Sequence, residues 1–222
     1  MRRSLPARSF LALTSIASVL LLGGAGQIAP QRQTRAYSDE QKAQLDKVSA
    51  YLNGIHSLKA RFVQIGPEGG TDQGTLYIQK PGQIRFEYNP PSALLIVATQ
   101  GRVYVKNARL NTVDHYDLAD TPLGLLLNQD VDLKANKAVM GIAEQNGAVI
   151  VQARTSTNRN NSNISLVFDA PSLELRQWTV KDNQGGSTTV ALQQPEKDVA
   201  LDDSLFDVPV KAPATRVKQS RN

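Results

Sequence analysis

The spacing of apolar residues along this chain of 222 residues changes its period once. Between residues 39 and 53, and just beyond, apolar side chains recur every three or four positions, at Leu45, Val48, Leu52 and Ile55. Ser38 precedes this segment and Gln41 follows three positions later, which is the pattern of a capping box at a helix start. The pattern predicts a helix over 39–53 with one apolar face that must be covered.

From residue 58 onward the period is two, as in strands with one buried face. Two alternating runs flank the turn Lys80-Pro81-Gly82, which lies inside the stretch YIQKPGQIRFEYNPP. Further turns are marked by Gly, Pro, Asn and Asp. The predicted strands lie at 58–62, 76–78, 84–88, 93–99, 102–106, 111–117, 138–145, 148–155, 162–168, 173–181 and 187–193.

Two segments interrupt the strand pattern. Residues 121–128 are a short apolar run with Pro122 where a first helical turn accepts proline, so we expect a helical piece held by packing. The phase of alternation shifts near Arg176-Gln177, which predicts a β-bulge just before Trp178.

Together, two helical segments and about eleven strands predict an α+β protein that is mainly antiparallel β structure. A sheet this long tends to curl. Helices on its concave side would then cover it as a lid.

The N-terminus has the pattern of a secretory signal peptide. Arg2, Arg3 and Arg8 precede a mostly apolar stretch over 10–22, and small residues follow. That stretch is shorter than the ~20 residues that cross a bilayer, so we favour cleavage, after Ala25 or Ala29, over an uncleaved anchor. We expect a signal peptide at 1–25, a linker at 26–37 and one domain at 38–210.

The net charge of +5 is concentrated at the two ends of the chain. Residues 211–222 contain four basic residues and no acid, which predicts a basic disordered tail. Residues 26–210 carry 18 basic and 20 acidic side chains, a net charge of −2. This balance argues against a surface that binds nucleic acid.

The residues that carry chemistry are sparse. Without cysteine there is no disulfide, thiolate metal site, cysteine nucleophile or lipid-modified N-terminal cysteine. His56 and His115 are the only histidines and have no partner at a useful spacing, and no nucleophile, metal or phosphate-binding motif occurs. The sequence therefore favours a binding protein without cofactor over an enzyme.

Apolar binding needs no polar motif. Burial contributes roughly 0.8 kcal/mol per methylene, so enclosing an acyl chain of ~14 methylenes gains on the order of 10 kcal/mol. A curved sheet under a helical lid suits that task, although the same residues also fit an ordinary packed core.

Several motifs in order resemble the LolA family of periplasmic lipoprotein carriers. The resemblance covers roughly residues 39–210 and rests on the following positions: Leu58, Ala60, Phe62 and Gln64; Gly74, Leu76, Ile78 and Lys80-Pro81-Gly82; Arg85-Phe86, Tyr88, Pro90 and Pro91; Ile96-Val97 and Gly101; Thr121-Pro122-Leu123 with 125–127; Asp182, Gly185, Gly186 and Thr188; and 205–209.

This resemblance implies an incomplete, strongly curved β-barrel with a helical lid over an apolar cavity for the acyl chains of lipoproteins. It implies a periplasmic monomer that takes cargo from an ABC-type release complex in the inner membrane. The cargo then passes to an outer-membrane receptor, or to the outer membrane itself.

The resemblance also suggests which residues act. Lys80 stands at the basic position before proline, which in this family bonds to backbone carbonyls of the lid helices, and Arg85 is a second candidate for a lid or rim contact. Strand alternation adds the expected cavity lining, namely Phe62, Leu76, Ile78, Phe86, Ile96, Leu125, Leu126 and Trp178.

An alternative function uses the same fold. A periplasmic regulator or sensor with the curved sheet would bind a signalling partner or a lipid. Such regulators carry a further C-terminal domain, and only about a dozen residues follow Pro209 here, which favours the carrier.

Overall fold

The computed structural model describes residues 37–156 and 161–208. The predicted signal peptide, nearly all of the predicted linker and the predicted basic tail lie outside the described residues. Within the described ranges, no helix has the length and apolar character needed to cross a membrane.

Eleven antiparallel strands form one open sheet in the order β6-β5-β4-β3-β2-β1-β11-β10-β9-β8-β7. Consecutive strands pair with one another except β6 and β7, which form the two edges, and at the centre β1 pairs with β11. The strands are β1 Ser57–Ile65, β2 Thr71–Gln79, β3 Gln83–Tyr88, β4 Leu94–Thr99, β5 Arg102–Asn107, β6 Thr112–Asp117, β7 Val139–Gln145, β8 Ala148–Ser156, β9 Asn161–Asp169, β10 Leu175–Lys181 and β11 Ser187–Lys197.

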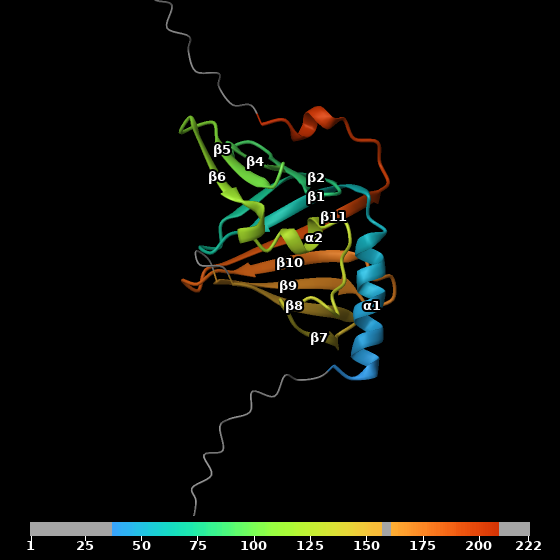
Figure 1. Ribbon diagram of the computed structural model, residues 1–222. Helices are drawn as coiled ribbons and strands as arrows, with labels where there is room; N and C mark the ends of the chain where they lie inside the picture. Colours follow the sequence, from blue (N-terminus) through green and yellow to red (C-terminus); the bar gives the residue numbers. More distant parts are fainter. Residues whose placement is uncertain (1–36, 157–160, 209–222) are drawn as a thin grey trace, which may run out of the picture. The chain divides into compact units, whose positions relative to one another are not determined.

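The sheet curves around the short helix α2, Gly124–Leu127, which lies in the connection between the edge strands β6 and β7 (Figure 1). Because the two edges do not pair, the barrel is incomplete. The predicted α+β class, the strand number and the short helical piece within 121–128 are confirmed.

Several strand boundaries differ from the predicted ones: β1 continues to Ile65 and β2 begins at Thr71, so both are longer than predicted. β10 begins at Leu175 rather than 173 because Leu173 has a φ of 55° and belongs to the tight turn after β9, where its N–H bonds to the Asp169 carbonyl. β11 continues to Lys197, four residues past the predicted end. The predicted bulge is confirmed by a register shift between Leu175 and Gln177.

Helix α1, Asp39–Asn53, begins as its sequence predicts. The Ser38 hydroxyl accepts a hydrogen bond from the Gln41 N–H, and the Gln41 side chain accepts one from the Ser38 N–H. Its buried face contains Leu45, Val48 and Leu52. These three side chains join the same hydrophobic core as the concave face of the sheet.

Strand register places the alternating apolar residues of β1, β2 and β3 on one face. Ala60 pairs with Leu76, which pairs with Phe86, and all three are at most 4% exposed. Gly74 leaves room for the Phe62 ring, since a Cβ atom there would lie 2.7 Å from Phe62 Cε1 and would overlap a backbone oxygen of β3.

The outer face of the sheet has its own cover near the C-terminal end of the described chain. Two 3₁₀ turns, which sequence patterns did not predict, are η1 Leu118–Asp120 and η2 Asp203–Phe206. η2 packs on β3 and β4, where Phe206 is 2% exposed and Val97 is 1% exposed. The described part of the closing motif, residues 205–208, therefore begins in a turn that covers the convex side of the sheet.

Candidate functional site

Two segments cover the concave face of the sheet. We call them the lid: helix α1 and residues 124–134, which include α2. Leu126 and Leu127 of α2 are buried, as are Val131 and Leu133 beyond it, and all four belong to the main hydrophobic core. The lid thus contributes apolar side chains to the interior that it covers.

Polar contacts tie the two parts of the lid together. The Asn53 side chain donates to the Val131 carbonyl at 3.0 Å and accepts from the Val131 N–H at 2.8 Å. The Ser49 hydroxyl accepts from the Leu133 N–H at 3.0 Å and donates to the Leu45 carbonyl at 2.8 Å. Because these polar groups satisfy one another, separating the two parts would leave the buried Ser49 hydroxyl without its Leu133 partner.

The Lys80–Gly82 turn contacts the ends of both lid helices. Lys80 Nζ donates to the Leu52 carbonyl oxygen at 2.7 Å, and the Gly82 N–H donates to the Leu127 carbonyl oxygen at 2.9 Å. Carbonyls in the last turn of a helix lack partners within it, and a cation is favoured at that end. One β-turn therefore joins the sheet to α1 and to α2.

The environment of Lys80 combines a favourable contact with a desolvation cost. The side chain is half-buried, and burial lowers the pKa of Lys80 from its ordinary 10.5 to about 8. The bond to the Leu52 carbonyl persists in either protonation state, because a neutral amine also donates.

Arg85, the second predicted lid residue, lies on the other face of the sheet. Its neighbours Ile84 and Phe86 point into the core, so alternation directs Arg85 outward. Arg85 Nη1 donates to the Leu205 carbonyl at 3.0 Å, and Nε donates to Glu87 at 3.2 Å. The expectation of a lid contact is wrong in this structure, since Arg85 instead holds η2 on the outer face.

Most residues expected to line a cavity pack against one another. Ile96 is partly buried against the core, and the remaining members of this packed set are at most 4% exposed: Phe62, Leu76, Ile78, Phe86, Leu126 and Trp178. The Phe86 ring meets Phe62 and Trp178 edge to face at 5.3 and 6.2 Å. With the lid closed, these side chains fill the interior themselves.

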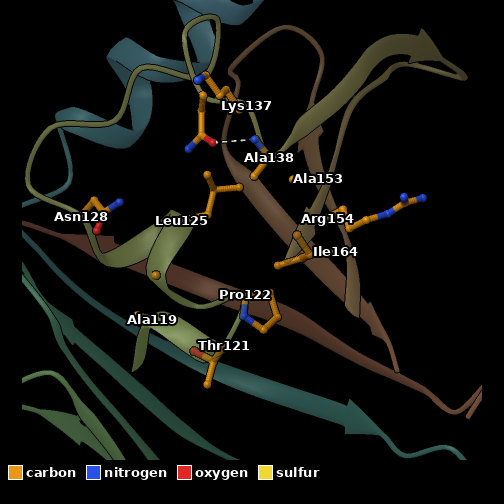
Figure 2. A pocket seen from close by; sticks show the side chains of 12 residues that line it. Ala119, Thr121, Pro122, Leu125, Asn128, Lys137, Ala138, Ala153, Arg154 and Ile164 are labelled. Carbon is orange, nitrogen blue, oxygen red and sulfur yellow. Dashed lines mark hydrogen bonds between the residues drawn. The ribbon is translucent and has the colours of Figure 1, made fainter. Parts of the chain in front are cut away.

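Leu125 differs from the other expected lining residues. It is half-buried and lines a cavity of about 520 Å³ between the 119–128 segment, the 136–138 loop and the strands β8 and β9 (Figure 2). Ala153 and Ile164 form part of its wall and are 2% and 1% exposed. Because both belong to the main core, this cavity adjoins the apolar interior at its margin.

Neither histidine has the surroundings of a catalytic group. His56 is exposed, with Nδ1 at 3.6 Å from Asp198, and His115 lies on the fully exposed strand β6 beside Tyr104. In the part of the chain that the structure describes, no group of three or more acidic or histidine side chains could hold a metal ion. The contacts described here support enclosure of apolar groups.

Sequence reasoning missed Asn53, Ser49 and the backbone N–H of Gly82. Asn53 carries only a helix-end signal, and Ser49 is a polar residue next to an apolar stripe, so neither indicates its partner. Their partners lie 78 and 84 residues away. Such contacts have no signature in local spacing.

The fold and the lid define a class: α+β proteins in which an open, curved antiparallel sheet encloses an apolar interior beneath helices. The family model described as outer membrane lipoprotein carrier protein LolA matches residues 53–209. The chain belongs to the LolA family.

Relatives support this assignment over most of the chain. An outer-membrane lipoprotein carrier protein of Dechloromonas aromatica is 24% identical over 172 residues, which cover 73% of this chain and 81% of the relative. Its counterpart from Leptothrix cholodnii is 28% identical over 189 residues, which cover 80% of this chain and 88% of that relative. Among solved structures, a LolA superfamily protein from Nitrosomonas europaea covers 74% of this chain and 97% of its own, at 6% identity and a TM-score of 0.43.

Proposed function

We propose that this protein is a periplasmic carrier that encloses the acyl chains of lipoproteins and delivers them to the outer membrane. Membership of the LolA family and the names of the curated relatives support this function. The carrier performs no chemistry of its own. Its proposed partners are an ATP-driven release complex in the inner membrane and an acceptor at the outer membrane, and residues 1–25 direct its export.

The observation that carries the proposal is the double contact of the Lys80–Gly82 turn with the lid. Breaking the contacts to Leu52 and Leu127 would free the C-terminal ends of α1 and α2 from the turn, while α1 keeps its other hydrogen bonds to the sheet. The freed ends would uncover a continuous apolar surface. A latch of one side chain and one backbone bond suits a lid that must open repeatedly.

Cargo loading is then an exchange of apolar contacts. In the closed lid the core side chains cover one another, and in the loaded protein acyl chains take the place of part of those contacts. Burying one acyl chain gains on the order of 10 kcal/mol of free energy, and the loss of core contacts on lid opening reduces this gain. Affinity stays moderate, so that the cargo can be handed on.

The test is transfer of an acylated lipoprotein. The protein lacking residues 1–25 is mixed with inner-membrane vesicles that contain the release complex, ATP and a labelled lipoprotein, and the soluble fraction is then presented to outer membranes. We expect a soluble complex with the protein. A cargo variant that lacks the acylated cysteine is expected to give none.

The role of the turn is tested with Lys80→Leu, which we expect to impair loading or transfer while circular dichroism and the unfolding midpoint show an intact fold. Lys59→Leu on the outer face is the matched control, because Lys59 is exposed and its Nζ lies over the Tyr77 ring, 6.0 Å from the ring centroid. Unchanged transfer by the Lys80 variant would remove the proposed role of the latch. Failure of the unmodified protein to acquire acylated cargo would remove the carrier function.

A further inference from the structure

The cavity beside α2 is uneven in charge. Of the twelve residues that line it, Lys137 and Arg154 are cationic and none is acidic. The apolar part of the wall includes Leu125, Ala153 and Ile164. A site with an apolar wall and two cations suits a ligand that has both an apolar chain and a negative charge.

The two cations occupy the outer margin of the cavity. Both side chains are exposed, whereas Ala153 and Ile164 are buried in the core, and Figure 2 shows the Arg154 side chain extending away from Leu125. Long basic side chains commonly cover apolar surface with their stems and keep the charge in water. The charges therefore lie where the head group of an inserted chain would meet solvent.

Local structure holds both residues at this margin. The Asn136 side chain accepts a hydrogen bond from the Ala138 N–H at 2.9 Å, which closes the turn that carries Lys137 (Figure 2). The Arg154 N–H donates to the Ala138 carbonyl at 2.8 Å, just before β7 begins. Both cations thus flank the same short stretch of backbone.

Among the described residues, no carboxylate pairs with either cation. Arg154 Nε donates at 3.2 Å to the amide oxygen of Asn163, which is uncharged. Lys134, only three residues before Lys137, pairs with Asp46 at 2.8 Å and provides the contrast.

We propose that this cavity is an entry site for single acyl chains and that Lys137 and Arg154 select amphiphiles with an anionic head group. The inference rests on the proposed carrier function and adds the ligand class and the residues that choose it. Leu125 belongs to the lid, lines the cavity and packs against the core, so its displacement would connect the bound chain with the interior.

The test compares two probes of equal chain length, decanoate and decanol, by displacement of a fluorescent fatty acid from the protein. We expect decanoate to bind more tightly. Lys137→Gln with Arg154→Gln should weaken decanoate binding by about fivefold to tenfold, as expected for two solvent-exposed charge contacts, and leave decanol binding unchanged. Added salt should reduce the preference in the same way.

Lys59→Gln is the control, because it removes an exposed cation on the outer face, away from the cavity and the lid, and should keep the preference for decanoate. Methyl resonances of Leu125 and Ile164 should shift when decanoate binds, which locates the site. The inference is overturned if the double variant keeps the preference, if both probes weaken equally, or if the two probes bind the unmodified protein alike. Absence of binding by either probe would instead count against the proposed function.

Discussion

Removing the amino group of Lys80 offers the most direct test of how the lid is held. Lys80→Met keeps an apolar stem of similar length and deletes the donor to the Leu52 carbonyl oxygen, 2.7 Å away. Hydrogen bonds that involve a charged group contribute about 1.5–3 kcal/mol. Burial of Lys80 offsets part of this gain, as its lowered pKa shows. We therefore expect the closed lid to lose about 1–2 kcal/mol.

That loss corresponds to about a 5- to 30-fold increase in the equilibrium constant for lid opening. Amide hydrogen exchange measures it at the right place, because the Gly82 N–H bonds to the Leu127 carbonyl and exchanges only when the turn separates from α2. Exchange at Gly82 should accelerate by about that factor in the variant. Amides of the exposed edge strand β6, which exchange while the lid is closed, should keep their rates.

The control for this experiment is Lys59→Met on the outer face, which should leave Gly82 exchange unchanged. Two results would refute the reasoning. Unaltered exchange at Gly82 would mean that Lys80 does not hold the lid, and equal acceleration in all strands would mean that Lys80 stabilises the whole fold instead.

Three further predictions concern stability, each measured by urea unfolding. Because Lys80 has a pKa of about 8 in the folded chain and 10.5 when released, the unfolded chain binds more protons between these values. The cost of burying the charged amine is present below pH 8 and is relieved as the pH rises. The unmodified protein should therefore gain stability relative to Lys80→Met between about pH 7 and about pH 9.5, a range below that in which the buried tyrosines titrate. A stability difference that stays constant over this range would contradict the prediction. Gly74→Ala should destabilise by about 3 kcal/mol because its methyl group overlaps β3, whereas Gly141→Ala, which has open space, should stay within about 0.5 kcal/mol. Ser49→Ala should cost about 1–3 kcal/mol and speed exchange of the Leu133 amide, which loses its acceptor, and unchanged exchange there would exclude the proposed tie within the lid.

Strand and helix positions were readable from the sequence because each depends on local spacing. A half-buried strand must alternate, and the capping box of Ser38 and Gln41 is complete within four residues. The bulge before Trp178 was equally visible, since one extra residue shifts the phase of alternation. The position of Leu173 in the turn before β10 could not be predicted, because a left-handed φ at a leucine does not change the alternation of apolar residues.

The candidate site also has features that the local sequence predicts and features that depend on distant residues. The place of Lys80 beside a turn glycine was evident, and the resemblance to the family supplied its expected target. Arg85 contacts the Leu205 carbonyl of the 3₁₀ turn at 203–206, which lies 120 residues away in the chain and covers the outer face. Local alternation puts Arg85 outside but cannot name what it meets there.

By itself, the amino-acid sequence determined the elements, the open antiparallel order of the strands in hairpins, and membership in a family with no catalytic motif. Those properties follow from the period of burial and from residues close together in the chain. Only the tertiary structure decided that the interior is filled by its own side chains, that Asn53 meets Val131, and that one turn holds both lid helices. These outcomes depend on how far the sheet curves and how the lid packs across it, which bring together groups that local spacing cannot connect.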